Sequence, residues 1–187
     1  PVAVHKVGKD SYIYDMGTCF VGFTEIKMPV VKKGKTIKLY YEDYYLNDLD
    51  DFRDKEYTDK YIGDGENPGN FSSKFNYKGY RYLKIIGLTE PLPLDAVTGG
   101  KVRTDYTART TFDCSDADIN TIYNMIHNTC HALTLGGYMV DCPQVERFGY
   151  GGDGNASTPT LQTLGNVAPL YMNWIGTWAD CQRPDGG

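Results

Sequence analysis

The 187-residue sequence lacks the features that mark membrane proteins, nucleic-acid-binding proteins and nucleotide-dependent enzymes. No stretch approaches the roughly 18 consecutive apolar residues of a transmembrane helix, so we expect no membrane insertion. The formal net charge is -5, and without a basic surplus the chain is a poor partner for phosphate backbones, which excludes nucleic acid as an expected ligand. No GxGxxG, P-loop or GxSxG element is present, and we expect no cofactor.

Cysteine occurs without any pairing pattern. The five cysteines are odd in number, widely spread and free of CxxC spacing, so they predict neither a disulfide framework nor a zinc site. His127 and His131 lie four residues apart and could face one metal. Ordinary helix side chains are the favoured interpretation, because no carboxylate or CxxC partner is near them, and we expect no metal. The cysteines are Cys19, Cys114, Cys130, Cys142 and Cys181.

Tyrosine is abundant, with 16 residues, and most of them fall in the first part of the chain. Between residue 10 and about residue 112, short runs rich in Tyr, Val, Ile, Thr and Phe alternate with Gly-, Pro- and Asp-rich turns, a pattern typical of an antiparallel β-sandwich. In GYRYLKIIG, residues 79–87, the alternation predicts a half-buried strand. For the acidic and aromatic run 40–56, a strand entering a solvated loop is favoured over a sugar-contacting edge. The predicted strands are 11–17, 19–28, 36–46, 60–63, 73–88 and 102–114.

After Cys114 the hydrophobic period becomes helical. Ser115 and Asp118 form a capping-box-like start, and Gly136 with Gly137 ends the first predicted helix. Two more helices are expected at about 154–164 and 169–181. Both faces of the last helix carry large apolar residues, so it needs more neighbouring helices than this chain supplies. The apolar face of the first helix, expected to be core, comprises Ile119, Ile122, Tyr123, Ile126, Cys130 and Leu133.

Between the first two predicted helices lies the acidic stretch DCPQVERFGYGGD, residues 141–153. Paired carboxyl groups are the equipment of glycoside cleavage, one donating a proton and the other activating water or attacking. Crowding of Asp141, Glu146 and Asp153 is expected to raise at least one of their pKa values. A solvated or calcium-binding loop is the alternative, although the acidic spacing does not match an EF-hand. Cys142 is expected to be a small buried hydrophobe. Spacing alone leaves catalysis and a structural loop equally open.

The same stretch resembles the DCPQRERLGWTGD-type signature of bacterial α-L-rhamnosidases of glycoside hydrolase family 78. The segments YIYDMGTCFVGFTEIKM, FNYKGYRYLKIIGL and TWADCQRPDGG also resemble segments of that family, so the match spans nearly the whole chain. The implied fold class is α+β: an antiparallel β-sandwich, residues 1–112, followed by the first helices of an (α/α)6 barrel, residues 113–187. The barrel is incomplete in this chain.

The resemblance also implies roles for individual residues. Glu146 would be the general acid that protonates the departing glycosidic oxygen. Asp141 and Asp153 correspond to carboxylates that hold the rhamnose hydroxyls. Arg147 would donate to sugar hydroxyls or neighbouring carboxylates, and Tyr150, at the usual tryptophan position, would pack against the sugar. The sequence departs from the signature at four positions, which leaves the sugar less certain than the family: Val145, Phe148, Tyr150 and Gly151.

The expected activity of the parent protein is hydrolysis of terminal α-L-rhamnosyl linkages with inversion, on a rhamnose-containing glycan or glycoside. The family's general base lies further along the barrel, so we expect this chain alone to be inactive. A non-catalytic carbohydrate-binding protein, or the same fold acting on another terminal deoxysugar, are the alternatives. The chain opens PVAVHKVGKD, without Met or a signal layout, which leaves localisation open, with a periplasmic or secreted location favoured. The oligomeric state is also left open.

Overall fold

The computed structural model describes residues 1–44 and 58–186, which form two compact units, Pro1–Val102 and Arg103–Gly187. Most of the acidic and aromatic run 40–56 therefore lies outside the described residues. The domain division that the sequence suggests after residue 112 stays a prediction. Among the described residues, no helix has the length and apolar character needed to cross a membrane.

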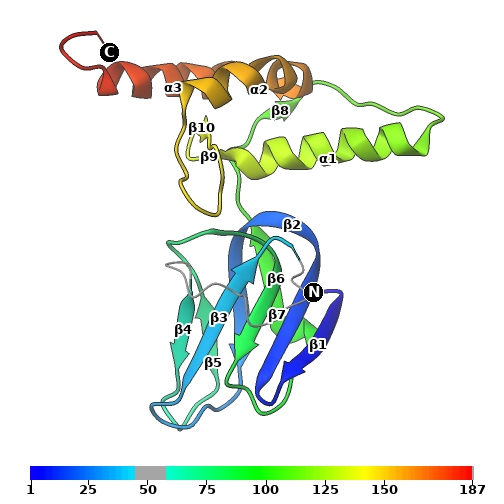
Figure 1. Cartoon of the computed structure of the whole chain (residues 1–187), viewed down its shortest axis with the longest axis vertical. Coiled ribbons are helices and arrows are strands. Elements are labelled where there is room, and N and C mark those ends of the chain that lie inside the picture. The colour runs from blue at the N-terminus through cyan, green and yellow to red at the C-terminus, as the bar shows by residue number, and fades with distance from the viewer. Residues whose placement is uncertain (45–57, 187) are drawn as a thin grey trace. The chain divides into compact units, whose positions relative to one another are not determined.

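The first unit is built on one seven-stranded antiparallel sheet with the order β1-β2-β6-β3-β4, to which β5 and β7 are added through β2 (Figure 1). The 3-10 turn η1 (Leu94–Ala96) precedes the last of these strands. The strands are β1 (Ala3–Gly8), β2 (Ser11–Met28), β3 (Thr36–Glu42), β4 (Asp59–Ile62), β5 (Gly69–Ser72), β6 (Lys78–Ile86) and β7 (Val97–Lys101).

Strand β2 makes the sandwich, because it changes partners along its 18 residues. Its register against β6 shifts between Asp15 and Phe20, where Gly17 has a φ of 84°. Before this bulge β2 pairs with β1, and after it β2 pairs with β7 and β5. The main core includes buried residues from both halves of β2, among them Tyr14 and Ile26, so the two layers enclose one apolar interior. The predicted antiparallel sandwich is confirmed.

Three strand predictions need correction. The runs 11–17 and 19–28 are one strand, because the bulge bends the chain without ending the ladder. The run 102–114 contains only the short β8 (Thr107–Ala108), since its backbone instead bonds to turns of the second unit, at Thr134 and Leu164. Strand β6 was predicted to be half-buried, but it lies between β2 and β3 with both faces largely buried, and even Lys84 is only 7% exposed.

The second unit contains three helices, α1 (Ala117–Leu133), α2 (Gly151–Leu164) and α3 (Ala168–Cys181). Two small ladders join them: β9 (Thr134–Leu135) with β10 (Tyr138–Met139), and β8 with β11 (Gly165–Asn166). The glycines predicted to end the first helix have positive φ angles in the β9–β10 turn. The buried core of this unit comprises Cys130, Met139, Leu161, Leu164, Val167, Leu170 and Trp174.

The helix starts differ in detail from the prediction. The N-cap of α1 is Asp116, whose carboxylate accepts from the N–H groups of Asp118 and Ile119, and not Ser115. Helix α2 begins at Gly151, three residues before the predicted start, which brings Asp153 into its first turn. Helix α3 was placed correctly, with Pro169 tolerated in its first turn.

The apolar face predicted as core on α1 is not buried in the described residues, apart from Cys130. Ile119, Ile122 and Ile126 are 44–54% exposed, and on α3 Ile175 is 57% exposed. The apolar periodicity predicts buried faces, but the described part of the chain provides no helices to cover them. The family resemblance implies a complete (α/α)6 barrel, in which further helices would pack against these faces.

Candidate active site

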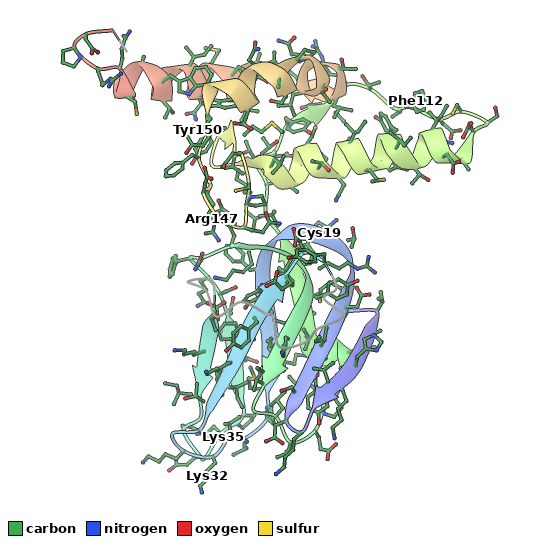
Figure 2. The ribbon with its side chains drawn as sticks, viewed as in Figure 1. Cys19, Lys32, Lys35, Phe112, Arg147 and Tyr150 are labelled. Atoms are coloured by element: carbon green, nitrogen blue, oxygen red, sulfur yellow. The ribbon has the colours of Figure 1, made fainter. Side chains whose placement is uncertain are left out.

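The acidic loop connects β10 to α2 and is closed by the side chain of Asp141. The backbone N–H of Asp141 donates to the carbonyl of Phe148 at 2.9 Å, and the N–H of Phe148 donates to Asp141 Oδ1 at 2.9 Å. These two bonds join the ends of the loop. Figure 2 shows Arg147 near the tip of the loop and Tyr150 close to its junction with α2. The loop is therefore an ordered turn in which a backbone N–H holds the carboxylate of Asp141.

The pKa of Asp141 is lowered, which is opposite to the crowding effect expected from the sequence. Loss of hydration acts to raise this pKa, but four hydrogen bonds together outweigh it. Backbone N–H groups of Cys142 and Phe148 donate to the carboxylate, as do the side chains of Cys142 and Glu146. These donors therefore favour the ionised form of Asp141.

Glu146 is exposed and lies between two other side chains of the loop. The hydroxyl of Tyr150 donates to Glu146 Oε2 at 3.1 Å, and the Glu146 side chain also bonds to the carboxylate of Asp141. The bond to Glu146 is the main reason why the pKa of Tyr150 is raised. The structure thus brings three of the five predicted site residues into one hydrogen-bonded series, Asp141, Glu146 and Tyr150.

Cys142 is a member of this arrangement that the sequence interpretation missed. Its Sγ donates to Asp141 Oδ2 at 3.4 Å and accepts from the backbone N–H of Glu146 at 3.4 Å. The residue is partly exposed, so the prediction of a buried hydrophobe was wrong. The thiol connects the two acidic residues, and only its place directly after Asp141 in the signature hinted at this.

Arg147 supports the turn that carries Glu146. Its Nε donates to the carbonyl of Pro143 at 3.0 Å, and its backbone N–H donates to the carbonyl of Cys142 at 3.2 Å. Arg147 has a φ of 65°, and among the described residues it is the one non-glycine residue with a positive φ. Such a conformation costs energy and persists where surrounding contacts enforce it, commonly at functional sites. Its expected bond to sugar hydroxyls stays a prediction.

Gly149 fixes the end of the loop to α3. Its carbonyl accepts from Nε1 of Trp174 at 3.4 Å and from Nε1 of Trp178 at 3.2 Å. A Cβ at this position would lie 2.7 Å from the ring of Tyr138 and 2.9 Å from Trp174 Nε1, so only glycine fits. Trp174 is buried, whereas Trp178 is 41% exposed. Their i, i+4 spacing, which puts both indoles on one helix face, was the available signal.

Asp153 lies in the first turn of α2, where a negative charge is stabilised by the helix dipole. Its charge contributes to the raised pKa of Tyr150, which places it near the hydrogen-bonded series. Its backbone carbonyl accepts from the hydroxyl of Ser157 at 2.7 Å. Asp153 therefore acts on the loop through its charge.

Possible metal ligands do not come together in residues 1–44 and 58–186, where no group of three His, Cys, Asp or Glu side chains is placed to hold an ion. The rings of His127 and His131 lie edge to face, with centroids 4.2 Å apart, and Arg103 bonds to His131. The guanidinium of Arg103, 2.6 Å from Nδ1 of His131, disfavours binding of a metal cation there.

Comparison with known proteins covers both units. Residues 5–103 match the family model of the bacterial alpha-L-rhamnosidase concanavalin-like domain, and residues 107–187 match that of the bacterial alpha-L-rhamnosidase 6 hairpin glycosidase domain. An alpha-L-rhamnosidase of Alteromonas sp. (strain LOR) is 26% identical over 195 residues, covering 100% of this chain and 21% of that protein. One of Formosa agariphila is 26% identical over 187 residues, covering 95% of this chain and 20% of that protein.

Solved structures agree with these matches. The alpha-L-rhamnosidase from Dictyoglumus thermophilum superposes with a TM-score of 0.86 at 26% identity, covering 98% of this chain and 21% of that one. The Streptomyces avermitilis enzyme complexed with L-rhamnose shares the fold, with a TM-score of 0.85 at 22% identity over 97% of this chain and 18% of that one. The chain thus spans about a fifth of the length of these relatives. With both units matched, the chain belongs to the bacterial alpha-L-rhamnosidase family.

Proposed function

We propose that the full-length protein hydrolyses terminal α-L-rhamnosyl linkages with inversion, and that Glu146 is its general acid. The observation that carries this proposal is the hydrogen-bonded series of Asp141, Glu146 and Tyr150 on an exposed loop. The donors around Asp141 favour its ionised form, whereas Glu146 is the exposed carboxyl group of the series and is accessible to a leaving oxygen. A protonated and accessible carboxyl group is what donation to a glycosidic oxygen requires.

The general base is proposed to lie outside this chain. An inverting enzyme separates its two carboxyl groups by roughly 6.5–9.5 Å, so that a water molecule fits between the base and the sugar. Asp141 bonds directly to Glu146 and leaves no such space. For this reason we expect the 187-residue chain alone not to turn over, whereas the full-length protein should.

The remaining site residues are proposed to hold the sugar. Asp141 and Asp153 would accept from rhamnose hydroxyls, and Arg147 would donate to them. The ring of Tyr150, 48% exposed, would pack against the apolar side of the sugar, including the C6 methyl group. The relative whose structure contains L-rhamnose supports this substrate class.

A panel of aryl glycosides tests the proposed function in the full-length protein. We expect release from aryl α-L-rhamnoside and much slower release from aryl glycosides of other deoxysugars. Preferred release of a different deoxysugar would show that rhamnose is not the substrate. This comparison matters because Val145 and Tyr150 depart from the family signature. Binding of rhamnosides without release would identify a carbohydrate-binding protein instead.

Substitution of Gly149 by alanine should disturb catalysis without touching an acidic residue. The added Cβ would meet the rings of Tyr138 and Trp174, so the loop must move by a few tenths of an ångström or more. Displacement of a catalytic group on this scale costs up to about 100-fold, so we expect kcat on rhamnosides to fall by roughly 10- to 100-fold. Steady-state kinetics measure this loss.

Gly152→Ala is the matched control, because a Cβ at Gly152 meets nothing within 4 Å. Alanine also favours the first turn of α2, where Gly152 lies. The control should retain full activity. Equal activities of the two variants would show that the close packing around Gly149 does not position the loop.

A further inference from the structure

The hydroxyl of Tyr150 has a partner that a ring packing against a sugar does not need. It donates to Glu146 Oε2 at 3.1 Å, across four residues of loop. The family signature usually has a tryptophan here, which has no hydroxyl. The bond is thus a feature of this chain's own sequence, and it involves the residue proposed as the general acid.

Tyr150 is anchored to the start of α2 and to a neighbouring ring. Its backbone carbonyl accepts from the N–H of Gly154 at 3.1 Å, which starts α2, and its ring lies against Phe148 with centroids 5.7 Å apart. The preceding residue, Gly149, is bonded to both tryptophans of α3. Glu146, in contrast, is exposed in a turn. The tyrosine hydroxyl therefore connects the acid to the end of the loop that is bonded to α2 and α3.

We propose that the Tyr150 hydroxyl positions Glu146 and stabilises the negative charge that the acid acquires as it gives up its proton. This inference rests on the proposed function. In the resting site the hydroxyl occupies one carboxyl oxygen. As the proton passes to the leaving oxygen, the same hydrogen bond becomes charge-assisted and strengthens. An interaction that is stronger in the transition state than in the ground state raises kcat.

Within the described part of the second unit, the charged and titratable groups that act on this pair come from the same loop and its helix. Asp141 bonds to Glu146, Cys142 Sγ accepts from the Glu146 N–H, and the charge of Asp153 acts on Tyr150. Among these groups, the tyrosine hydroxyl is the neutral side chain that donates to the Glu146 carboxyl group. Its removal leaves the acidic groups in place and takes away a donor that favours the ionised acid, so the acid should keep its proton to higher pH.

The test is Tyr150→Phe in the full-length protein, which removes the hydroxyl and keeps the ring. A hydrogen bond to a charged group implies that kcat on rhamnosides with poor leaving groups falls about tenfold. KM and the rate on activated aryl rhamnosides should change little, and the basic limb of the pH profile of kcat/KM should move to higher pH. A loss shared equally by both substrate types, a rise in KM alone, or unchanged kinetics would each overturn the proposal.

Two comparisons keep this result interpretable. Tyr106→Phe removes a buried hydroxyl that has no hydrogen-bond partner among the described residues, and it should leave the kinetics and the pH profile unchanged. Glu146→Gln, measured alongside, must show dependence on the leaving group. If it does and Tyr150→Phe does not, the positioning role fails while the general acid stands. If neither does, the proposed function itself fails.

Discussion

Glu146→Gln is expected to slow the release of rhamnose from glycosides with poor leaving groups by about 10²- to 10⁴-fold, the usual contribution of general acid catalysis. The amide cannot supply a proton to the glycosidic oxygen. It retains an oxygen that can accept from the Tyr150 hydroxyl, so the loop should keep its shape. Initial rates of the full-length protein on alkyl and aryl rhamnosides measure the effect.

The dependence on the leaving group separates acid catalysis from loop damage. Activated aryl rhamnosides need little proton donation, so their loss should be much smaller than that of alkyl rhamnosides. Glu66→Gln, an exposed glutamate of the first unit, is the control and should behave like the unaltered protein. Equal losses on both substrate types would argue against Glu146 as the acid.

Asp59→Ala is expected to destabilise the first unit by about 3–5 kcal/mol, the usual cost of removing one partner from a buried ion pair. Lys78 Nζ lies 3.7 Å from Asp59 Oδ1, and the lysine side chain is only 2% exposed. The hydroxyl of Tyr41 donates to Asp59 Oδ2 at 2.8 Å, while Lys78 Nζ lies 5.5 Å from the centroid of the Tyr41 ring. The substitution therefore removes a carboxylate that both a buried cation and a buried hydroxyl contact.

Hydrogen exchange of the amides in β3, β4 and β6 measures this effect in the full-length protein. At about 1.4 kcal/mol per tenfold change, their protection should fall by roughly 100-fold or more. The control is Arg81→Gln, which breaks the more exposed pair with Asp15, at 2.9 Å. Exposed pairs contribute about 1 kcal/mol or less, so protection should change little. Similar effects of both substitutions would mean that burial of Lys78 adds nothing.

The sequence predicted those elements of the fold that the local spacing of apolar residues defines. The change from strand to helical spacing after Cys114 and the limits of α3 follow from local patterns. The continuity of β2 does not, because a bulge at Gly17 and a turn look alike in sequence. Residues 102–114 resemble a strand by composition, but their backbone bonds to Thr134 and Leu164, partners that local propensity does not reveal.

For the site, the signature located the loop but not its internal contacts. The bond between Tyr150 and Glu146 closes over a turn in which Arg147 has a positive φ, a conformation that local propensity does not predict. The bonds of Gly149 to α3 span 25 and 29 residues, beyond the reach of any local pattern. The lowered pKa of Asp141 follows from backbone donors that appear only once the loop is closed. Spacing indicated which residues gather, and the closed loop supplies the donors that favour an ionised Asp141.

Proton NMR of the hydrolysis of an aryl α-L-rhamnoside by the full-length protein tests the central claim most directly. The spectrum identifies the anomer of rhamnose that is released first, before mutarotation mixes the two forms. An acid on this loop working with a distant base predicts the β-anomer as the first product. First release of the α-anomer would contradict the account, because retention requires a nucleophilic carboxylate close to the acid.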